Sequence, residues 1–159
     1  MTSLFPPDEP VAEYFSRSDT LHKFGTFSQH GFSLEGLKWP SVEHYYQAMK
    51  FEDVRYRERI RLTDHPKNAR KLGRNRWQRR RKDWKQVKVT VMTRGVYIKC
   101  RTHPDIAEAL LATDGKTLIE SSNYDYFWGC GRDRRGENMY GKVLMNVREK
   151  LKQEHQPQA

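Results

Sequence analysis

Apolar residues recur at spacings of three and four along several stretches of the chain, which is the period of an α-helix. The stretch after Ser41 has this period, and serine commonly caps helix N-termini. The pattern therefore predicts a helix over 42–61 and leaves open a break near Asp53. Pro66 stands at a first-turn position and a glycine follows seven residues later, so we expect a short helix over 67–72.

The second half of the chain has the same period. Trp84 begins an apolar stripe that continues to Ile98. The alternation within 87–91 leaves a strand open, but the length of the stripe and its lack of turn residues favour a helix. The pattern also predicts helices over 105–112 and 140–151, and the second of these is amphipathic.

Extended structure is expected only in two short segments, 32–37 and 116–120. A chain of 159 residues has the length of one ordinary domain. We therefore predict a mainly α, compact single domain with little or no sheet, spanning residues 11–152 between tails at 1–10 and 153–159.

The composition is polar, with 36% hydrophobic and 31% charged residues. No stretch approaches the roughly 20 apolar residues of a membrane span, and the first ten residues lack the basic and apolar parts of a secretory signal. Cys100 and Cys130 stand far apart, which supports neither a disulfide framework nor a zinc site. We expect a soluble intracellular protein, cytoplasmic or, in a eukaryote, nuclear, with no membrane partner, no metal and no cofactor. The sequence sets no oligomeric state, and a monomer is compatible with it.

The formal net charge of +10 is unevenly distributed. Between Arg55 and Arg101 there are 18 lysines and arginines against three acidic residues, and the rest of the chain has an acidic excess. Such a segment favours a polyanionic partner, usually one that carries phosphates. A solvated surface that keeps the protein soluble is the alternative.

One motif places three polar residue types on a common helix face. Glu43, Gln47 and Lys50 stand at positions i, i+4 and i+7, with an axial span of about 10.5 Å. In a cleft, the carboxylate and the amine would form an acid/base and a nucleophile. The alternative is that Glu43 only complements the helix N-terminus and Lys50 is solvated, and the spacing alone favours this alternative.

A second motif is the glycine-rich segment 123–141, which lets the backbone approach a ligand closely, for example at Gly129. Trp128 offers a stacking face, and three further side chains offer hydrogen bonds to hydroxyl groups: Asp125, Asp133 and Asn138. The segment matches neither a P-loop nor a dinucleotide-binding loop. A plain surface turn is the alternative, and we rank a functional role above it.

A third motif interleaves aromatic and basic residues. Trp77 and Trp84 lie among the arginines and lysines that begin at Arg74. This composition is typical of proteins that bind single-stranded or damaged nucleic acid. For Trp84, a position in the core is about as well supported as a stacking role.

In this order, the segments resemble the NADAR (YbiA-like) family, over roughly residues 14–151. The resemblance rests on Trp39-Pro-x-x-Glu43-His-Tyr-x-Gln47-Ala-x-Lys50-Phe, on Ala69-Arg-x-Leu-Gly73-Arg74, on the helix that begins at Trp84, and on Trp128-Gly-x-Gly with the following Gly-x-Asn138-x-x-Gly-x-x-Leu-Met-x-Val-Arg148. It implies a compact, mainly helical N-glycosidase without a metal, which cleaves the bond between a nitrogen and C1 of a ribose. Two substrate classes occur in the family: ribosylamino-pyrimidine phosphates of riboflavin biosynthesis, and ADP-ribose attached to guanine in nucleic acid.

By this resemblance, Glu43 and Lys50 are the catalytic pair, and Lys50 forms a Schiff base with the ring-opened sugar. The candidates for substrate binding are Gln47, Arg74, Trp84, Asp125, Trp128, Gly129, Asp133 and Asn138. The basic segment favours nucleic acid, so we predict an enzyme that removes ADP-ribose from guanine bases, with ADP-ribose or ADP-ribosylated nucleic acid as its partner. The alternatives are a glycosidase of the riboflavin intermediates and a non-catalytic module that binds ADP-ribose or nucleic acid.

Overall fold

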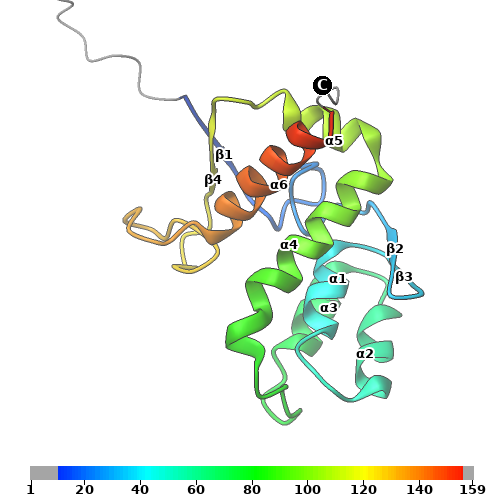
Figure 1. Ribbon diagram of the computed structural model, residues 1–159. Helices are drawn as coiled ribbons and strands as arrows, with labels where there is room; N and C mark the ends of the chain where they lie inside the picture. Colours follow the sequence, from blue (N-terminus) through cyan, green and yellow to red (C-terminus); the bar gives the residue numbers. More distant parts are fainter. Residues whose placement is uncertain (1–10, 156–159) are drawn as a thin grey trace, which may run out of the picture.

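The structure, a computed structural model, describes residues 11–155 (Figure 1). These residues form β1 (Ala12–Phe15), β2 (Phe32–Leu34), β3 (Leu37–Trp39), α1 (Val42–Ala48), α2 (Val54–Arg61), α3 (Pro66–Gly73), α4 (Trp84–Thr102), α5 (Pro104–Leu111), β4 (Thr117–Glu120) and α6 (Met139–His155). The predicted tail at 1–10 lies outside the described residues. Of the predicted tail at 153–159, the first three residues continue α6 and the rest lie outside the described part.

The predicted helices are present, and one of them is divided into two. The segment 42–61 forms two helices, α1 and α2, so the break near Asp53 is real. Asp53 begins α2 because its side chain accepts hydrogen bonds from the backbone N–H groups of Arg55 and Tyr56. The segment 87–91 lies inside α4, and the strand alternative there is wrong.

The prediction of little or no sheet is wrong, because the described residues form two small sheets and a mixed α/β fold. β1 and β4 pair in parallel, from Ala12↔Thr117 to Phe15↔Glu120. Short-range periodicity cannot detect a four-residue strand whose partner lies a hundred residues away. β2 and β3 form an antiparallel hairpin in place of the single extended segment expected at 32–37.

Helix α1 lies at the centre of the fold, between α3 and α4 (Figure 1). All seven of its residues are buried. On the α4 side, Gly95 permits a close approach, since a Cβ there would lie 3.0 Å from the ring of Tyr45. Because polar groups in such a position need partners, the side chains of Glu43 and Gln47 must be satisfied inside the protein.

Lys99 of α4 fixes the loop that approaches α1. Lys99 is 2% exposed, and its ammonium group donates hydrogen bonds to the carbonyl oxygens of Lys23 (2.6 Å) and Gly25 (3.0 Å) and to the hydroxyl of Ser28. Between these anchors, the carbonyl oxygen of Thr26 accepts a hydrogen bond from the N–H of Glu43 at 3.0 Å. The loop therefore holds the first turn of α1 in place.

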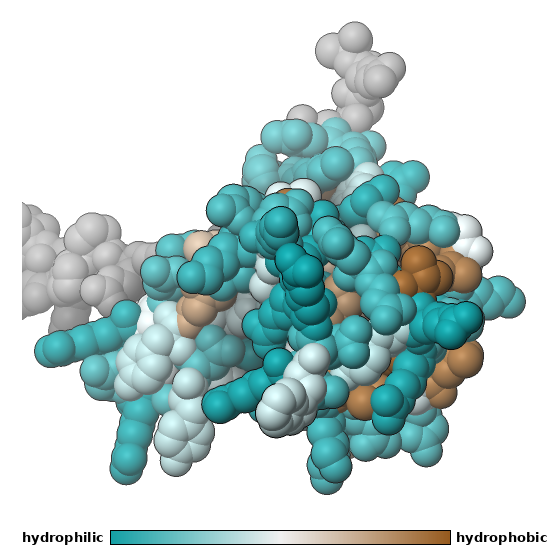
Figure 2. Space-filling view, turned by 90° about the horizontal axis from the view of Figure 1, so that it is seen from below, coloured by the Kyte–Doolittle hydropathy of each residue, from teal (hydrophilic) through white to brown (hydrophobic). Residues whose placement is uncertain are grey.

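The exposed surface is mainly hydrophilic on the face that carries α2, α3 and the start of α4 (Figure 2). Among the helices of residues 11–155, none combines the length and the apolar character that crossing a membrane requires.

Candidate active site

A cavity of about 160 Å³ lies beside α1. Its walls come from α1, α3, α4 and the loops that follow β1 and β4. The lining residues are Arg17, Glu43, Tyr46, Gln47, Lys50, Arg70, Arg74, Met92, Asp125 and Trp128. Carboxylates, a lysine and several arginines thus converge in one small space, which is a common property of catalytic sites.

Glu43 is held as an ionised carboxylate. It is 2% exposed, and its Oε1 accepts hydrogen bonds from Gln47 Nε2 (2.7 Å) and Arg70 Nε (2.9 Å). Its Oε2 accepts one from Thr26 Oγ1 at 2.7 Å. Burial acts most strongly and would raise the pKa of Glu43, but the charge of Arg70 and these hydrogen bonds together outweigh it, and the pKa lies below its ordinary value.

Lys50 reaches the same cavity from just beyond the end of α1. The helix ends at Ala48 with Met49 as its C-cap, so Lys50 does not lie on the helix face that its spacing from Glu43 predicts. Its Nζ lies 5.3 Å from the centre of the Tyr46 ring and forms no hydrogen bond or ion pair with other residues of 11–155.

The pKa of Lys50 is lowered to about 7. Burial is the main cause, because desolvation disfavours the charged form of an amine. Neighbouring arginine charges, that of Arg80 above all, act in the same direction, and Glu43 opposes them. A substantial fraction of the Lys50 side chains is therefore uncharged at neutral pH.

The wall opposite α1 depends on an ion-pair cluster. Arg17 is 7% exposed and contacts Glu120 Oε2 at 3.2 Å and Asp125 Oδ2 at 2.7 Å. Asp125 Oδ1 also accepts hydrogen bonds from the backbone N–H groups of Phe127 (3.0 Å) and Trp128 (2.7 Å). These contacts occupy both oxygens of Asp125 and shape the loop that carries Trp128.

Aromatic side chains form the third wall. The indole N–H of Trp128 donates a hydrogen bond to the hydroxyl of Tyr46 at 3.2 Å. Burial raises the pKa of Tyr46 to about 12, so this hydroxyl remains protonated at neutral pH. Trp84 packs on the Tyr46 ring with centroids 5.2 Å apart, but it does not line the cavity. Trp84 is thus a buried support of the site.

Gln47 is fixed by a close approach of α3. A Cβ at Gly73 would lie 1.8 Å from Gln47 Oε1, so any larger residue at this end of α3 would displace the Gln47 side chain. The same Oε1 and Nη2 of Arg70 are buried without hydrogen-bond partners among the described residues. The amide therefore holds Glu43 from one side and keeps an unused acceptor.

The cavity adjoins a wider hollow of about 400 Å³. The two share Arg17, Arg70, Arg74 and Asp125, and the outer one adds Ser122, Asn123 and Tyr124. A volume of this size is within the range of about 300–1,000 Å³ typical of small-molecule sites. The three shared arginines make the outer hollow suited to an anion.

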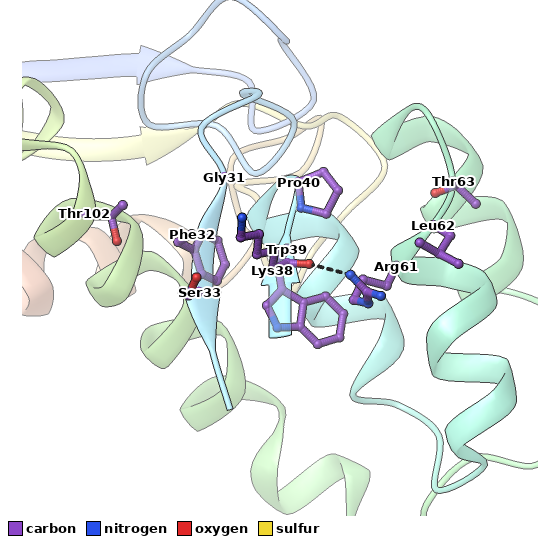
Figure 3. Close-up of a pocket in the computed structure, with 10 residues that line it drawn as sticks. All are labelled: Gly31, Phe32, Ser33, Lys38, Trp39, Pro40, Arg61, Leu62, Thr63 and Thr102. Carbon is purple, nitrogen blue, oxygen red and sulfur yellow. Dashed lines mark hydrogen bonds between the residues drawn. The ribbon is translucent and has the colours of Figure 1, made fainter. Parts of the chain in front are cut away.

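A larger hollow of about 600 Å³ lies elsewhere, between the β2–β3 hairpin and the end of α2 (Figure 3). Its walls are mainly apolar, as at Phe32 and Trp39, and Arg61 donates a hydrogen bond to the carbonyl oxygen of Lys38 at 3.1 Å, drawn as a dashed line in Figure 3. No aspartate, glutamate, histidine or cysteine lines it. The smaller cavity is the better candidate because it alone combines a carboxylate with an amine of lowered pKa.

Of the predicted site residues, Trp84, Gly129, Asp133 and Asn138 do not line the cavity. Asn138 accepts a hydrogen bond from the N–H of Glu120 (2.8 Å) and donates one to the carbonyl oxygen of Leu118 (2.9 Å), which ties β4 to the start of α6. A Cβ at Gly129 would lie 2.5 Å from Glu120 Oε2. Asp133 is exposed and 3.9 Å from Arg135. Contact of these four residues with a substrate stays a prediction.

The structure adds lining residues that the sequence reading did not single out: Arg17, Tyr46, Arg70 and Met92. Arg70 belongs to the Ala69–Arg74 motif, and its position in that motif could have identified it as a site residue. Arg17 has no such signal, because its partners Glu120 and Asp125 lie more than a hundred residues away in the chain. Within residues 11–155, no group of three or more His, Cys, Asp or Glu side chains is placed to hold a metal ion.

The chain is similar to known proteins over nearly its whole length. A family model described as "NADAR domain" matches residues 8–152. The N-glycosidase YbiA of Shigella flexneri is 38% identical over 143 residues, which are 90% of this chain and 89% of that protein. A riboflavin biosynthesis protein of Vibrio vulnificus is 41% identical over 151 residues, which are 94% of this chain and 40% of that protein. Among solved structures, the NMR structure of the Escherichia coli protein YbiA matches with a TM-score of 0.84 and 37% identity, covering 95% of this chain and 92% of that one.

Proposed function

Because the chain belongs to the NADAR domain family and is a hydrolase of the N-glycosidase class, we propose that it removes ADP-ribose from guanine bases of nucleic acid. The bond it hydrolyses joins a base nitrogen to C1 of the ribose, and Glu43 and Lys50 are its catalytic residues. The observation that carries the proposal is that the buried Lys50 amine, whose pKa is lowered, lies in the same small cavity as the buried Glu43 carboxylate.

Lys50 is the nucleophile in this proposal. A ribose linked through an amine opens to an imine at C1, and the uncharged Nζ adds to that carbon. A proton passes from Nζ to the base nitrogen, the base leaves with the electron pair of its bond to C1, and a Schiff base joins Lys50 to the sugar. Water then adds to C1, a proton returns to Nζ, and Lys50 leaves as the free ribose forms.

Glu43 acts as a carboxylate. Its negative charge stabilises the positive charge on the Schiff-base nitrogen, and it accepts a proton from the attacking water. Oε1 already accepts two hydrogen bonds, and Oε2 accepts one from Thr26, so Oε2 has the capacity for the water. Hydrogen bonds on both oxygens hold the group in one orientation throughout the reaction.

The arginines supply the binding energy for the anionic part of the substrate. The inner cavity takes the ribose beside Lys50, and the outer hollow takes the diphosphate between Arg17, Arg70 and Arg74. Arginine suits this role because its planar donors match phosphate oxygens. Trp128 closes the inner cavity and limits the access of water to the Schiff base.

The basic segment supports a nucleic-acid substrate, since one small phosphate does not require 18 lysines and arginines. A second candidate is the hydrolysis of ribosylamino-pyrimidine phosphates of riboflavin biosynthesis. The likeness to a riboflavin biosynthesis protein of Vibrio vulnificus favours this candidate. Both substrates place an N-linked C1 beside the same amine.

A comparison of substrates tests the choice. The protein is incubated separately with an oligonucleotide that carries ADP-ribosylated guanine and with a ribosylamino-pyrimidine phosphate, and kcat/KM is measured for each. We expect the larger value for the oligonucleotide. A larger value for the pyrimidine would assign the second candidate in its place.

Trapping of the Schiff base tests the mechanism. With borohydride present during turnover, the wild-type protein should gain the mass of the reduced sugar adduct at Lys50. Lys50→Ala should lose both the adduct and the activity, and Lys142→Ala, a change of an exposed lysine on α6, should keep both. Wild-type activity in Lys50→Ala would refute the Schiff base, and retained ligand binding without activity in the wild type would indicate a non-catalytic binding module.

A further inference from the structure

The loop between α3 and α4, residues 74–83, exposes a tryptophan almost completely. We name this segment the basic loop. Trp77 is 97% exposed, whereas the other three tryptophans, Trp39, Trp84 and Trp128, are 2% to 7% exposed. An indole in water brings no packing energy to the fold. Its exposure therefore points to a contact outside the chain.

The same loop carries an excess of positive charge. Its exposed basic side chains, with one from the first turn of α4, are Arg74, Arg76, Arg79, Arg80, Lys82 and Lys85. None of the six forms an ion pair within residues 11–155. The acidic residue of the loop, Asp83, is already paired with Arg81 at 2.6 Å. The charge on the loop is thus available to a polyanion.

The basic loop is joined to the active site at two points. The backbone N–H of Arg81 donates a hydrogen bond to the carbonyl oxygen of Lys50 at 2.8 Å. Arg74, at the start of the loop, lines both the inner cavity and the outer hollow. These contacts place both ends of the basic loop beside the residues of the cavity. The loop lies at the lower end of the molecule in Figure 1, on the mainly hydrophilic face of Figure 2.

We propose that the basic loop is a docking surface for single-stranded nucleic acid, in which Trp77 stacks on an unpaired base and the neighbouring arginines contact the flanking phosphates. An exposed aromatic ring among positively charged side chains is what single-stranded nucleic acid binds. A paired duplex presents no free base face to Trp77, and a surface that serves solubility alone has no use for an exposed indole. The inference deepens the proposed function. Binding of a strand to the basic loop is independent of that function, and only the reaction of the bound strand at the cavity rests on it.

Binding of an unmodified strand tests the surface apart from catalysis. The probe is an unmodified single-stranded DNA of about 12 nucleotides, with fluorescence anisotropy of a labelled strand and tryptophan fluorescence as readouts. We expect Trp77→Ala to bind roughly 5- to 100-fold more weakly. Trp77→Phe should keep most of the affinity, since it retains a stacking ring, and should lose most of the fluorescence quenching.

Charge is tested by the salt dependence of the same binding. Replacing Arg76 and Arg79 with alanine should reduce the slope of log K against log salt by about 1.4, because each phosphate contact on a single strand contributes about 0.7. The matched control replaces Lys142 and Lys150, two exposed lysines of α6. It removes the same charge away from the loop and should leave the slope within about 0.3 of wild type.

Three results would overturn the docking surface: equal affinity of wild type and Trp77→Ala, equal affinity for a duplex of the same sequence, or equal affinity for heparin without quenching. The last would indicate a general polyanion site. A separate result bears on the proposed function: if the unmodified strand binds as expected but an ADP-ribosylated strand is not turned over, the surface stands and the assigned reaction fails.

Discussion

Replacing Lys50 with methionine should make the protein more stable while it removes the activity. Methionine has similar length and no charge, so it fits a site where Lys50 is 6% exposed and has no hydrogen bond within the described chain. A lysine with a pKa of about 7 in the fold and an ordinary value of 10.5 when unfolded binds its proton more weakly in the folded state. The folded state is therefore penalised wherever the unfolded chain is protonated.

The size of the effect follows from this difference in pKa. At pH 7 the penalty is about 4 kcal/mol, and at pH 9 it falls to about 2 kcal/mol, because removing the proton from the unfolded lysine costs less free energy as the pH approaches its unfolded pKa. The free energy of unfolding therefore rises with pH between the folded and unfolded pKa values of Lys50. Lys50→Met removes the penalty, so its free energy of unfolding should exceed that of wild type by several kcal/mol at pH 7 and by less at pH 9.

Urea unfolding at pH 7, 8 and 9 measures these differences. Lys142→Met, a change of an exposed lysine, is the control and should leave both the stability and its pH dependence nearly unchanged. The reasoning is wrong if Lys50→Met is no more stable than wild type at pH 7, or if the stability difference between the two proteins does not shrink toward pH 9. Either result would mean that Lys50 is solvated and charged in the folded protein.

Three further predictions concern the neighbours of Lys50 and the frame around them. Glu43→Gln should lower kcat by about 10²–10⁴-fold with a small change in KM, measured by steady-state kinetics, since it removes a proton acceptor and leaves the shape intact; an unchanged kcat would exclude Glu43 from the chemistry. Gly73→Ala should lower activity by displacing Gln47, whose Oε1 would lie 1.8 Å from the new Cβ, and activity equal to wild type would contradict this packing. Asn138→Ala should lower the free energy of unfolding in urea by about 1–3 kcal/mol, since it leaves two backbone groups unpaired. If the folded variant also loses substrate affinity, Asn138 contacts the substrate as well.

Helical periodicity predicted the helices well because each of their signals is local. The cap at Asp53, the proline at the first position of α3 and the stripe from Trp84 all act within a few residues. The parallel pair β1–β4 has no local signal, since four-residue strands gain their stability from a distant partner. This is why the fold was predicted as nearly all helical and is in fact mixed.

The site was predictable as far as its motif extends along α1. Glu43, Gln47 and Lys50 meet in one cavity, although Lys50 lies past the helix and not on its face. The spacing could not reveal that α1 is buried on every side, which depends on α3 and α4 packing around it. The ion pair between Arg17 and Asp125 also depends on distant packing, so the residues next to Arg17 in the sequence do not indicate it.

The ion pairs of Arg17 have a consequence for the order in which the enzyme is made. Arg17 leaves the ribosome early, but its partners Glu120 and Asp125 follow 103 and 108 residues later. The helix with Glu43 and the amine of Lys50 are synthesised long before the wall that encloses them. A nascent or prematurely ended chain therefore holds Lys50 without the wall formed by Glu120 and Asp125, and the proposed site is complete only when nearly the whole domain has emerged.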